Sequence, residues 1–160
     1  MILILGTIPS KESIRRNEYY GNPRNQFWKL VSESHGMDPF PDYEDRLSFL
    51  RDRRIALWDV LMECEREGSS DSSIRLPRAN EFNEFLNCHE EISHIFFNGK
   101  RSEELFKRLV ILDSDIEDRI VKSGLPSSSP ANTMSFKEKL KVWRGVALNI
   151  HSAPSTRKIK

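Results

Sequence analysis

The sequence predicts an α/β domain, a three-layer α/β/α sandwich around a four-stranded, mainly parallel sheet. Short apolar runs alternate along the chain with segments of helical periodicity. Strands that alternate with helices usually pair in parallel, because a parallel connection needs a crossover of a dozen or more residues. A chain of 160 residues also fits one compact domain with an ordinary core. We place the domain at residues 1–150 and a basic tail at 151–160.

Four apolar runs are the predicted strands: Ile2–Gly6, Ile55–Asp59, Ile95–Gly99 and Ile120–Gly124. Apolar residues at helical spacing predict four helices: Asn25–Ser34, Tyr43–Arg51, Asn80–Asn87 and Phe136–Ile150. In an open parallel sheet, ligands bind outside the carboxyl ends of the strands. We therefore expect the functional site in the loops that follow the strands: Thr7–Arg24, Asp59–Ile74, Asn98–Ser102 and Leu125–Thr133.

Charge is distributed unevenly along the chain, although the formal net charge is only +1. Residues 1–29 carry five Lys or Arg against two Asp or Glu, and residues 137–160 carry seven against one. The segment between them carries thirteen against twenty-one. If the two basic ends meet on one face, that face attracts phosphates. The alternative is a solvated tail beside an ordinary acidic surface, and charge alone does not separate the two.

Several functional classes lack their sequence signatures. No run of eighteen apolar residues is present, and the apolar start of the chain lacks the basic flank of a secretory signal. Neither GxGxxG nor a P-loop occurs, which argues against the nucleotide sites built on them. Cys64 and Cys88 are typical of a reducing compartment, and with His89 and His94 they lack zinc-site spacing. We expect a cytoplasmic protein that needs no metal and no cofactor.

The first predicted loop combines aromatic and basic side chains. Tyr19 and Tyr20 follow Arg15 and Arg16. Aromatic rings stack on nucleobases and arginines hold phosphates, so this mixture suits a nucleic-acid ligand. The alternative is that both tyrosines pin a long loop to the domain.

Five sequence blocks together resemble a known enzyme family. In chain order they are LGTIPS at 5–10, YYGNPRNQFW at 19–28, ALWDVL with CEREGS at 56–61 and 64–69, FNG at 97–99, and LPSSSPAN at 125–132. Their order and spacing are similar to those of the hypoxanthine-DNA glycosylase branch of the uracil-DNA glycosylase superfamily. The resemblance implies a four-stranded, mostly parallel sheet between helices. It also implies an enzyme that flips a deaminated base out of DNA and hydrolyses its N-glycosidic bond.

The resemblance points to Asn25 as the catalytic residue. In most of the superfamily an Asp or Asn two residues after the first glycine orients the attacking water, but this chain has Ile8 there. The hypoxanthine branch uses instead the asparagine of its tyrosine–asparagine block, which matches Asn25. A neutral amide suffices, because the reaction needs an oriented water more than a strong base. The alternative is that Asn25 caps the helix that follows it.

Asn98 is the second candidate catalytic residue. It ends a predicted strand beside Gly99, where its amide would hydrogen-bond the leaving base, although Asn-Gly is also a common turn. The expected base pocket consists of Gly6, Thr7, Pro9, Tyr20, Phe27, Trp58 and Asp59. We expect Phe27 or Tyr20 to stack on the base. Asp59 would accept from a base N–H or cap a loop, and Trp58 would line the pocket or fill the core.

The serine block resembles the superfamily motif that enters the minor groove at the lesion. Ser127, Ser128 and Ser129 offer hydroxyl and N–H groups to phosphates, and Pro130 stiffens the loop. Pro130 or Leu125 would replace the wedge that some relatives insert into the base stack. The remaining expected phosphate contacts are basic residues near the two ends of the chain: Arg15, Arg16, Lys137, Lys141, Arg144, Arg157, Lys158 and Lys160.

Together these inferences predict a monomeric, monofunctional DNA glycosylase of base excision repair that leaves an abasic site. Its partner would be damaged DNA carrying hypoxanthine first and uracil second, and in a bacterium it would associate with the nucleoid. Two alternatives remain open. One is a catalytically lapsed DNA-binding module, which Ile8 supports if Asn25 is inert. The other is a glycosidase of free nucleosides, against which the serine block and the basic ends argue.

Overall fold

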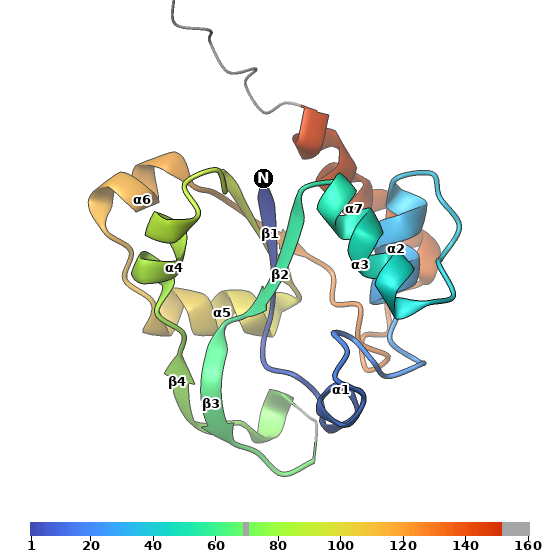
Figure 1. Ribbon diagram of the computed structural model, residues 1–160. Coiled ribbons are helices and arrows are strands. Elements are labelled where there is room, and N and C mark those ends of the chain that lie inside the picture. Colours follow the sequence, from blue (N-terminus) through green and yellow to red (C-terminus); the bar gives the residue numbers. More distant parts are fainter. Residues whose placement is uncertain (69–70, 152–160) are drawn as a thin grey trace, which may run out of the picture.

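The computed structural model describes residues 1–68 and 71–151, with helices on both faces of a central sheet (Figure 1). The four strands of this sheet are β1 (Ile2–Gly6), β2 (Ile55–Asp59), β5 (His94–Asn98) and β6 (Val121–Leu125). They pair in the order β2-β1-β5-β6, and every pair is parallel. The predicted α/β/α sandwich is confirmed.

The helices divide between the two faces of the sheet (Figure 1). One face is covered by α2 (Phe27–Ser34), α3 (Tyr43–Asp52) and α7 (Phe136–His151). The other is covered by α4 (Phe82–Cys88), α5 (Lys100–Leu109) and α6 (Ser114–Arg119). The central strand β1 is fully buried, and its alternate side chains serve the two cores. Ile2 and Ile4 pack with the first set of helices, and Leu3 and Leu5 with the second.

Two predicted loops contain regular structure. The loop after β1 includes α1 (Lys11–Arg16), which Ser10 caps by accepting a hydrogen bond from the Ser13 N–H at 3.1 Å. The loop after β2 includes β3 (Leu61–Glu65), which pairs antiparallel with β4 (Arg75–Ala79) beyond a short 3-10 turn at Asp71–Ser73. Helices α5 and α6 were not predicted either. The eight predicted elements are all present, each within two residues of its expected bounds.

The strand order positions the site. β1 pairs with β2 on one side and with β5 on the other. The chain therefore first moves from β1 to β2 and later crosses back past β1 to form β5, so the strand order changes direction at β1. A crevice opens outside the carboxyl ends of the strands at such a switch point. Gly6 and Asp59 are partners in register at this edge, and Asn98 ends the neighbouring strand.

Within residues 1–68 and 71–151, no helix is long and apolar enough to cross a membrane. The last helix extends through His151, the first residue of the predicted tail, and the rest of that tail, with Arg157, Lys158 and Lys160, lies outside the described residues.

Candidate active site

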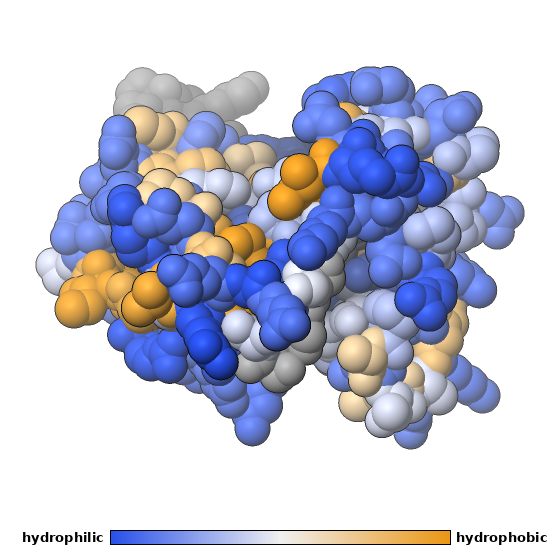
Figure 2. All heavy atoms as spheres, turned by 90° about the horizontal axis from the view of Figure 1, so that it is seen from below, coloured by the Kyte–Doolittle hydropathy of each residue, from blue (hydrophilic) through white to orange (hydrophobic). Residues whose placement is uncertain are grey.

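A cavity of about 1120 Å³ opens at this edge of the sheet, between the segment that follows β1 and the loop that follows β6. Viewed from the carboxyl ends of the strands, the surrounding face is mainly hydrophilic with separate apolar patches (Figure 2). Most of the residues expected at the site line this cavity: Gly6, Thr7, Pro9, Tyr20, Asn25, Asp59, Asn98, Ser127, Ser128, Ser129 and Pro130. The fold therefore brings together residues from five separate parts of the sequence.

The Asp59 carboxyl is buried in the cavity wall beside Gly6. A Cβ at Gly6 would lie 2.4 Å from Asp59 Oδ1 and 3.2 Å from Tyr20 Oη, so only glycine admits this approach. Asp59 is 7% exposed, and within the described ranges its carboxyl has no hydrogen-bond donor. Burial raises the pKa of Asp59 to about 7; nearby Asp71 adds to the rise and Arg66 opposes it. A buried, unsatisfied carboxyl that faces a cavity is suited to a ligand that donates a hydrogen bond.

Tyr20 lines the cavity together with Tyr19 and Tyr43, and Phe27 supports its ring from behind. The two rings stack with centroids 3.8 Å apart and planes 13° apart. Phe27 is completely buried and does not line the cavity, so the expectation that it belongs to the base pocket was wrong. Phe27 begins α2 and points into the core against Trp28 and Trp143. Burial raises the pKa of Tyr20 and the charge of nearby Asp59 adds to the rise, so its hydroxyl stays neutral.

Two other candidates, Trp58 and Leu125, lie in the hydrophobic cores and not at the cavity. For Trp58 this is the alternative that the sequence left open, and it arises because neighbouring residues on a strand point to opposite faces of the sheet. Trp58 precedes Asp59 and packs in the second core, with ring centroids 5.0 Å from Phe82 and 4.2 Å from Phe85. It therefore does not line the cavity. Leu125 is 5% exposed and packs in the first core, so it is not available as a wedge. Pro130 is exposed and does line the cavity.

Asn25 lies at the cavity and also at the start of α2. Its Oδ1 accepts a hydrogen bond from the Phe27 N–H at 2.9 Å. Gln26, in the N-cap position, makes no side-chain cap of its own. Asn25 therefore does contact the start of the helix, as its alternative role requires. It fixes the orientation of the Asn25 amide without removing it from the cavity wall.

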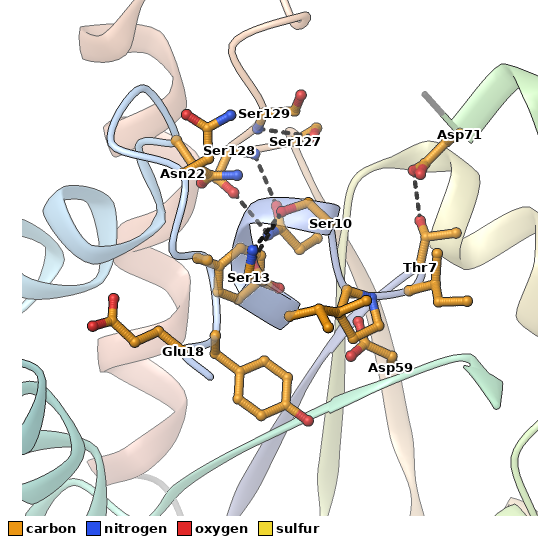
Figure 3. A pocket seen from close by; sticks show the side chains of 18 of the residues that line it. Thr7, Ser10, Ser13, Glu18, Asn22, Asp59, Asp71, Ser127, Ser128 and Ser129 are labelled. Atoms are coloured by element: carbon orange, nitrogen blue, oxygen red, sulfur yellow. Dashed lines mark hydrogen bonds between the residues drawn. The ribbon is translucent and has the colours of Figure 1, made fainter. Parts of the chain in front are cut away.

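Asn98 holds the loop of residues 127–132, called the serine loop below, with both polar ends of its side chain. Its Nδ2 donates to Ser128 Oγ at 2.8 Å, and its Oδ1 accepts from the Ser128 N–H at 2.9 Å. Gly99, with φ of 106°, allows close packing, since a Cβ there would lie 2.8 Å from Ser127 Cβ. Ser127 and Ser129 are joined in turn by a bond of 3.2 Å (Figure 3). The end of β5 and the serine loop thus form one unit.

Arg66 and Asp71 also line the cavity, although no role for them was expected from the sequence. Thr7 Oγ1 donates to Asp71 Oδ2 at 2.8 Å (Figure 3). Arg66 donates to the Pro9 carbonyl at 2.7 Å and lies 3.8 Å from Asp71 Oδ1. These contacts brace the Thr7–Pro9 turn from the segment that follows β3. The only signal in the sequence was the position of Arg66 within the CEREGS block.

The basic residues expected to contact phosphates lie outside the cavity lining. Arg15 and Arg16 are exposed on α1, and Lys137, Lys141 and Arg144 are exposed on α7. Contact of these residues with DNA stays a prediction.

Comparison with known proteins identifies relatives over nearly the whole chain. No protein-family model matches it. The hypoxanthine DNA glycosylase of Methanosarcina acetivorans is 40% identical over 147 residues, which cover 91% of this chain and 89% of the relative. That of Methanosarcina barkeri is 36% identical over 143 residues, covering 89% and 87%.

A solved structure agrees with these relatives. The solution NMR structure of a Methanosarcina acetivorans protein, provisionally assigned as a uracil DNA glycosylase, matches with a TM-score of 0.76 and 37% identity. The match covers 94% of this chain and 90% of that protein. The chain therefore belongs to the hypoxanthine DNA glycosylase family, enzymes that hydrolyse N-glycosyl bonds on a uracil-DNA glycosylase-like fold.

Proposed function

We propose that this enzyme removes hypoxanthine from damaged DNA, with uracil as its second substrate, and leaves an abasic site for base excision repair. The observation that carries the proposal is the unsatisfied Asp59 carboxyl in a cavity whose wall also holds the Tyr20 ring. Phe27 covers one face of that ring. A flipped base stacks on the other face and presents its Watson–Crick edge to Asp59.

The chemistry of deamination explains why a carboxylate suits this position. Hypoxanthine has an N1–H donor beside its carbonyl, whereas N1 of adenine is an acceptor beside an amino group. Ionised Asp59 accepts from the N1–H of hypoxanthine and meets only a lone pair in adenine. A site that leaves such a polar group unpaired rejects the wrong base by factors on the order of 10⁴. Uracil offers the equivalent N3–H. Guanine also carries N1–H, so the cavity wall has to exclude its 2-amino group.

Base release needs an oriented water and no covalent intermediate. The bond between C1′ and the base breaks with its electron pair on the departing base. Water adds to C1′ and gives up a proton, and the departing base anion gains one from the solvent, which yields free hypoxanthine and an abasic site. Asn25 Oδ1 orients that water, since the Phe27 N–H already fixes the amide. Lys100 is the one lysine in the described cavity lining, and it forms no Schiff base in this scheme.

The serine loop, which also lines the cavity, holds the DNA backbone. Ser127 and Ser129 offer hydroxyls to phosphates, and Asn98 keeps Ser128 in place between them. All of these walls come from a single chain, so one copy suffices and we propose a monomer. The site of action is the compartment that holds the DNA, which is the cytoplasm and its nucleoid in a prokaryote.

A cleavage panel tests the proposal. Duplexes that carry one inosine, uracil or xanthine, one thymine mismatch, or no lesion are incubated with excess enzyme, and abasic sites are revealed by alkali. Inosine should react fastest, uracil second, and the undamaged duplex not at all. Borohydride should trap no covalent adduct. An adduct lost in Lys100→Ala would contradict the hydrolytic scheme. Tight binding of the inosine duplex without base release would favour a lapsed module, and release from free deoxyinosine alone would favour a nucleosidase.

A further inference from the structure

Lys139, which the charge pattern counts among the basic residues of the C-terminal end, is buried inside the molecule. It is 1% exposed, whereas its neighbours Lys137 and Lys141 on α7 are exposed. Lysine is almost never fully buried unless its charge is paired. Among the described residues, however, Lys139 makes no ion pair with a carboxylate. The desolvated position lowers its pKa, so the fold bears a cost for keeping this ammonium.

The two acceptors of this ammonium belong to two segments that both line the cavity. Lys139 Nζ donates to Gln26 Oε1 at 3.0 Å and to the Asn132 carbonyl at 3.2 Å. Gln26 directly follows Asn25, and Asn132 ends the serine loop. The Gln26 N–H also donates to the Ser128 carbonyl at 3.0 Å. Lys139 therefore joins the start of α2 to the serine loop from behind the cavity.

We propose that Lys139 is a positioning residue whose buried ammonium fixes the Asn25–Gln26 turn against the Ser127–Asn132 loop. The catalytic part of this proposal rests on the proposed function. The water that Asn25 orients has to meet the sugar of a nucleotide whose backbone the serine loop holds. The distance between these two segments thus sets the alignment of the reaction.

The chemistry of lysine explains why a neutral residue does not serve. Two oxygens in separate segments have to be bridged from one point, and an ammonium has three donors that it can aim independently. Hydrogen bonds from a charged donor are also roughly twice as strong as neutral ones. Methionine has a similar length and flexibility but has no donor, which makes Lys139→Met the matched loss of both bonds.

Hydrogen exchange tests whether Lys139 holds these two segments together, without reference to catalysis. In Lys139→Met, the amides of Gln26 and Ser128 should lose protection relative to the wild type. The control is Lys107→Met, which removes the same charge from an exposed position on α5, on the other face of the sheet. That control should leave both amides unchanged. Unchanged protection in Lys139→Met would overturn the proposal.

Single-turnover kinetics tests the catalytic consequence. At a temperature well below the melting transition, Lys139→Met should lower the rate of inosine release roughly ten- to a hundredfold, as expected for misaligned reacting groups. Gln26→Ala removes one acceptor and should reproduce part of this loss. The two substitutions should be less than additive in the double variant, because they break the same contact. If Lys139→Met does not fold, Gln26→Ala carries both measurements, since Gln26 makes no cap bond that α2 needs.

The possible outcomes separate this proposal from the proposed function. Loosened amides with an unchanged rate would show a purely structural lysine and would overturn the positioning role. Additive effects of the two substitutions would show that Lys139 does not act through Gln26. A wild-type protein that releases no base would contradict the proposed function and, with it, the catalytic role of Lys139. The hydrogen-exchange result would still decide whether Lys139 holds the two segments together.

Discussion

Glu12 and Arg15 form a two-point ion pair on the exposed side of α1. Arg15 Nη2 lies 2.6 Å from Glu12 Oε1, and Arg15 Nε lies 3.0 Å from Oε2. Arg16 Nε reaches the same Oε1 at 2.7 Å. The hydrogen bonds from Arg15 and Arg16 lower the pKa of Glu12 to about 2, so Glu12 stays ionised near neutral pH. One carboxylate thus opposes the charge of both α1 arginines that are expected to contact phosphates.

Glu12→Gln should therefore strengthen duplex binding. Freed Arg15 and Arg16 release more counterions on contact with DNA, and each additional phosphate contact steepens the log–log salt dependence of affinity by about one. Fluorescence anisotropy across a salt series measures both quantities. Glu117→Gln, which breaks the exposed pair with Lys122 on the far side of the sheet, is the matched control and should change neither. An unchanged salt slope in Glu12→Gln would place α1 outside the DNA interface.

The hydrogen bonds between Asn98 and Ser128 predict that Asn98→Ala weakens DNA binding. The Ser128 N–H and hydroxyl lose their partners inside the protein, which costs roughly 1–3 kcal/mol for a buried donor. The serine loop should loosen, and affinity for the inosine duplex should fall about tenfold.

Asn98→Asp distinguishes this role from contact with the leaving base. A carboxylate still accepts from the Ser128 N–H and from its hydroxyl, so the loop and the affinity should be kept. If Asn98→Asp binds normally but releases base far more slowly, the side chain acts on the base as well as on the loop.

The sequence predicted the central sheet because buried parallel strands have a strong local signature. The bounds of Ile2–Gly6 and Ile55–Asp59 were correct to the residue. The β3–β4 pair was missed because β3 is mostly exposed and β4 contains Pro77, so neither has the pattern of a buried strand. In α5, charged residues outnumber apolar ones, and the helix becomes evident only where Leu105 and Phe106 reach the core.

The site was predicted as a set of residues, but their individual contacts could not be. Sequence motifs located the carboxyl ends of β1, β2 and β5, and the structure brings these ends to one cavity. Whether Tyr20 or Phe27 faces that cavity depends on the path of the loop before α2. Burial separates Lys139 from Lys137 and Lys141, and charge counting treats the three alike.

The raised pKa of Asp59 predicts a pH dependence of base release. If ionised Asp59 accepts the N1–H of hypoxanthine, the single-turnover rate should rise with pH to a plateau above about 7. Asn has no titrating group, so Asp59→Asn should flatten this limb of the profile. A wild-type rate that falls above pH 7 would instead identify the protonated carboxyl as the active form.

The same residue predicts a pH dependence of stability. The pKa of Asp59 is raised from 3.8 to about 7 in the native protein, so the native state holds a proton that the unfolded chain releases between these values. The contribution of Asp59 to the free energy of unfolding should therefore fall by about 1.4 kcal/mol per pH unit as pH rises through this window. Urea denaturation of wild type and Asp59→Asn at pH 4.5 and 7.5 measures it. The variant should gain relative stability at the higher pH, and a constant difference would contradict the shift.

Asn25→Ala should lose both chemistry and a modest amount of stability. Loss of an oriented catalytic group typically costs about 2.7–4 kcal/mol of barrier, a hundredfold or more in rate. Loss of the bond from the Phe27 N–H should cost about 1 kcal/mol of folding free energy. Single-turnover release of hypoxanthine and urea denaturation measure the two effects separately. A variant that melts early but cleaves at nearly the wild-type rate would assign Asn25 to the helix start alone.

Asn25→Ser separates the two roles in one substitution. The serine hydroxyl accepts from an N–H two residues ahead, as Asn25 Oδ1 does from Phe27, so stability should remain close to wild type. Its side chain is shorter and lacks the amide, so it withdraws the group that orients water. Release of hypoxanthine should therefore remain as slow as in Asn25→Ala while urea denaturation returns to the wild-type value. Recovery of the rate together with the stability would instead show that Asn25 contributes only through the start of α2.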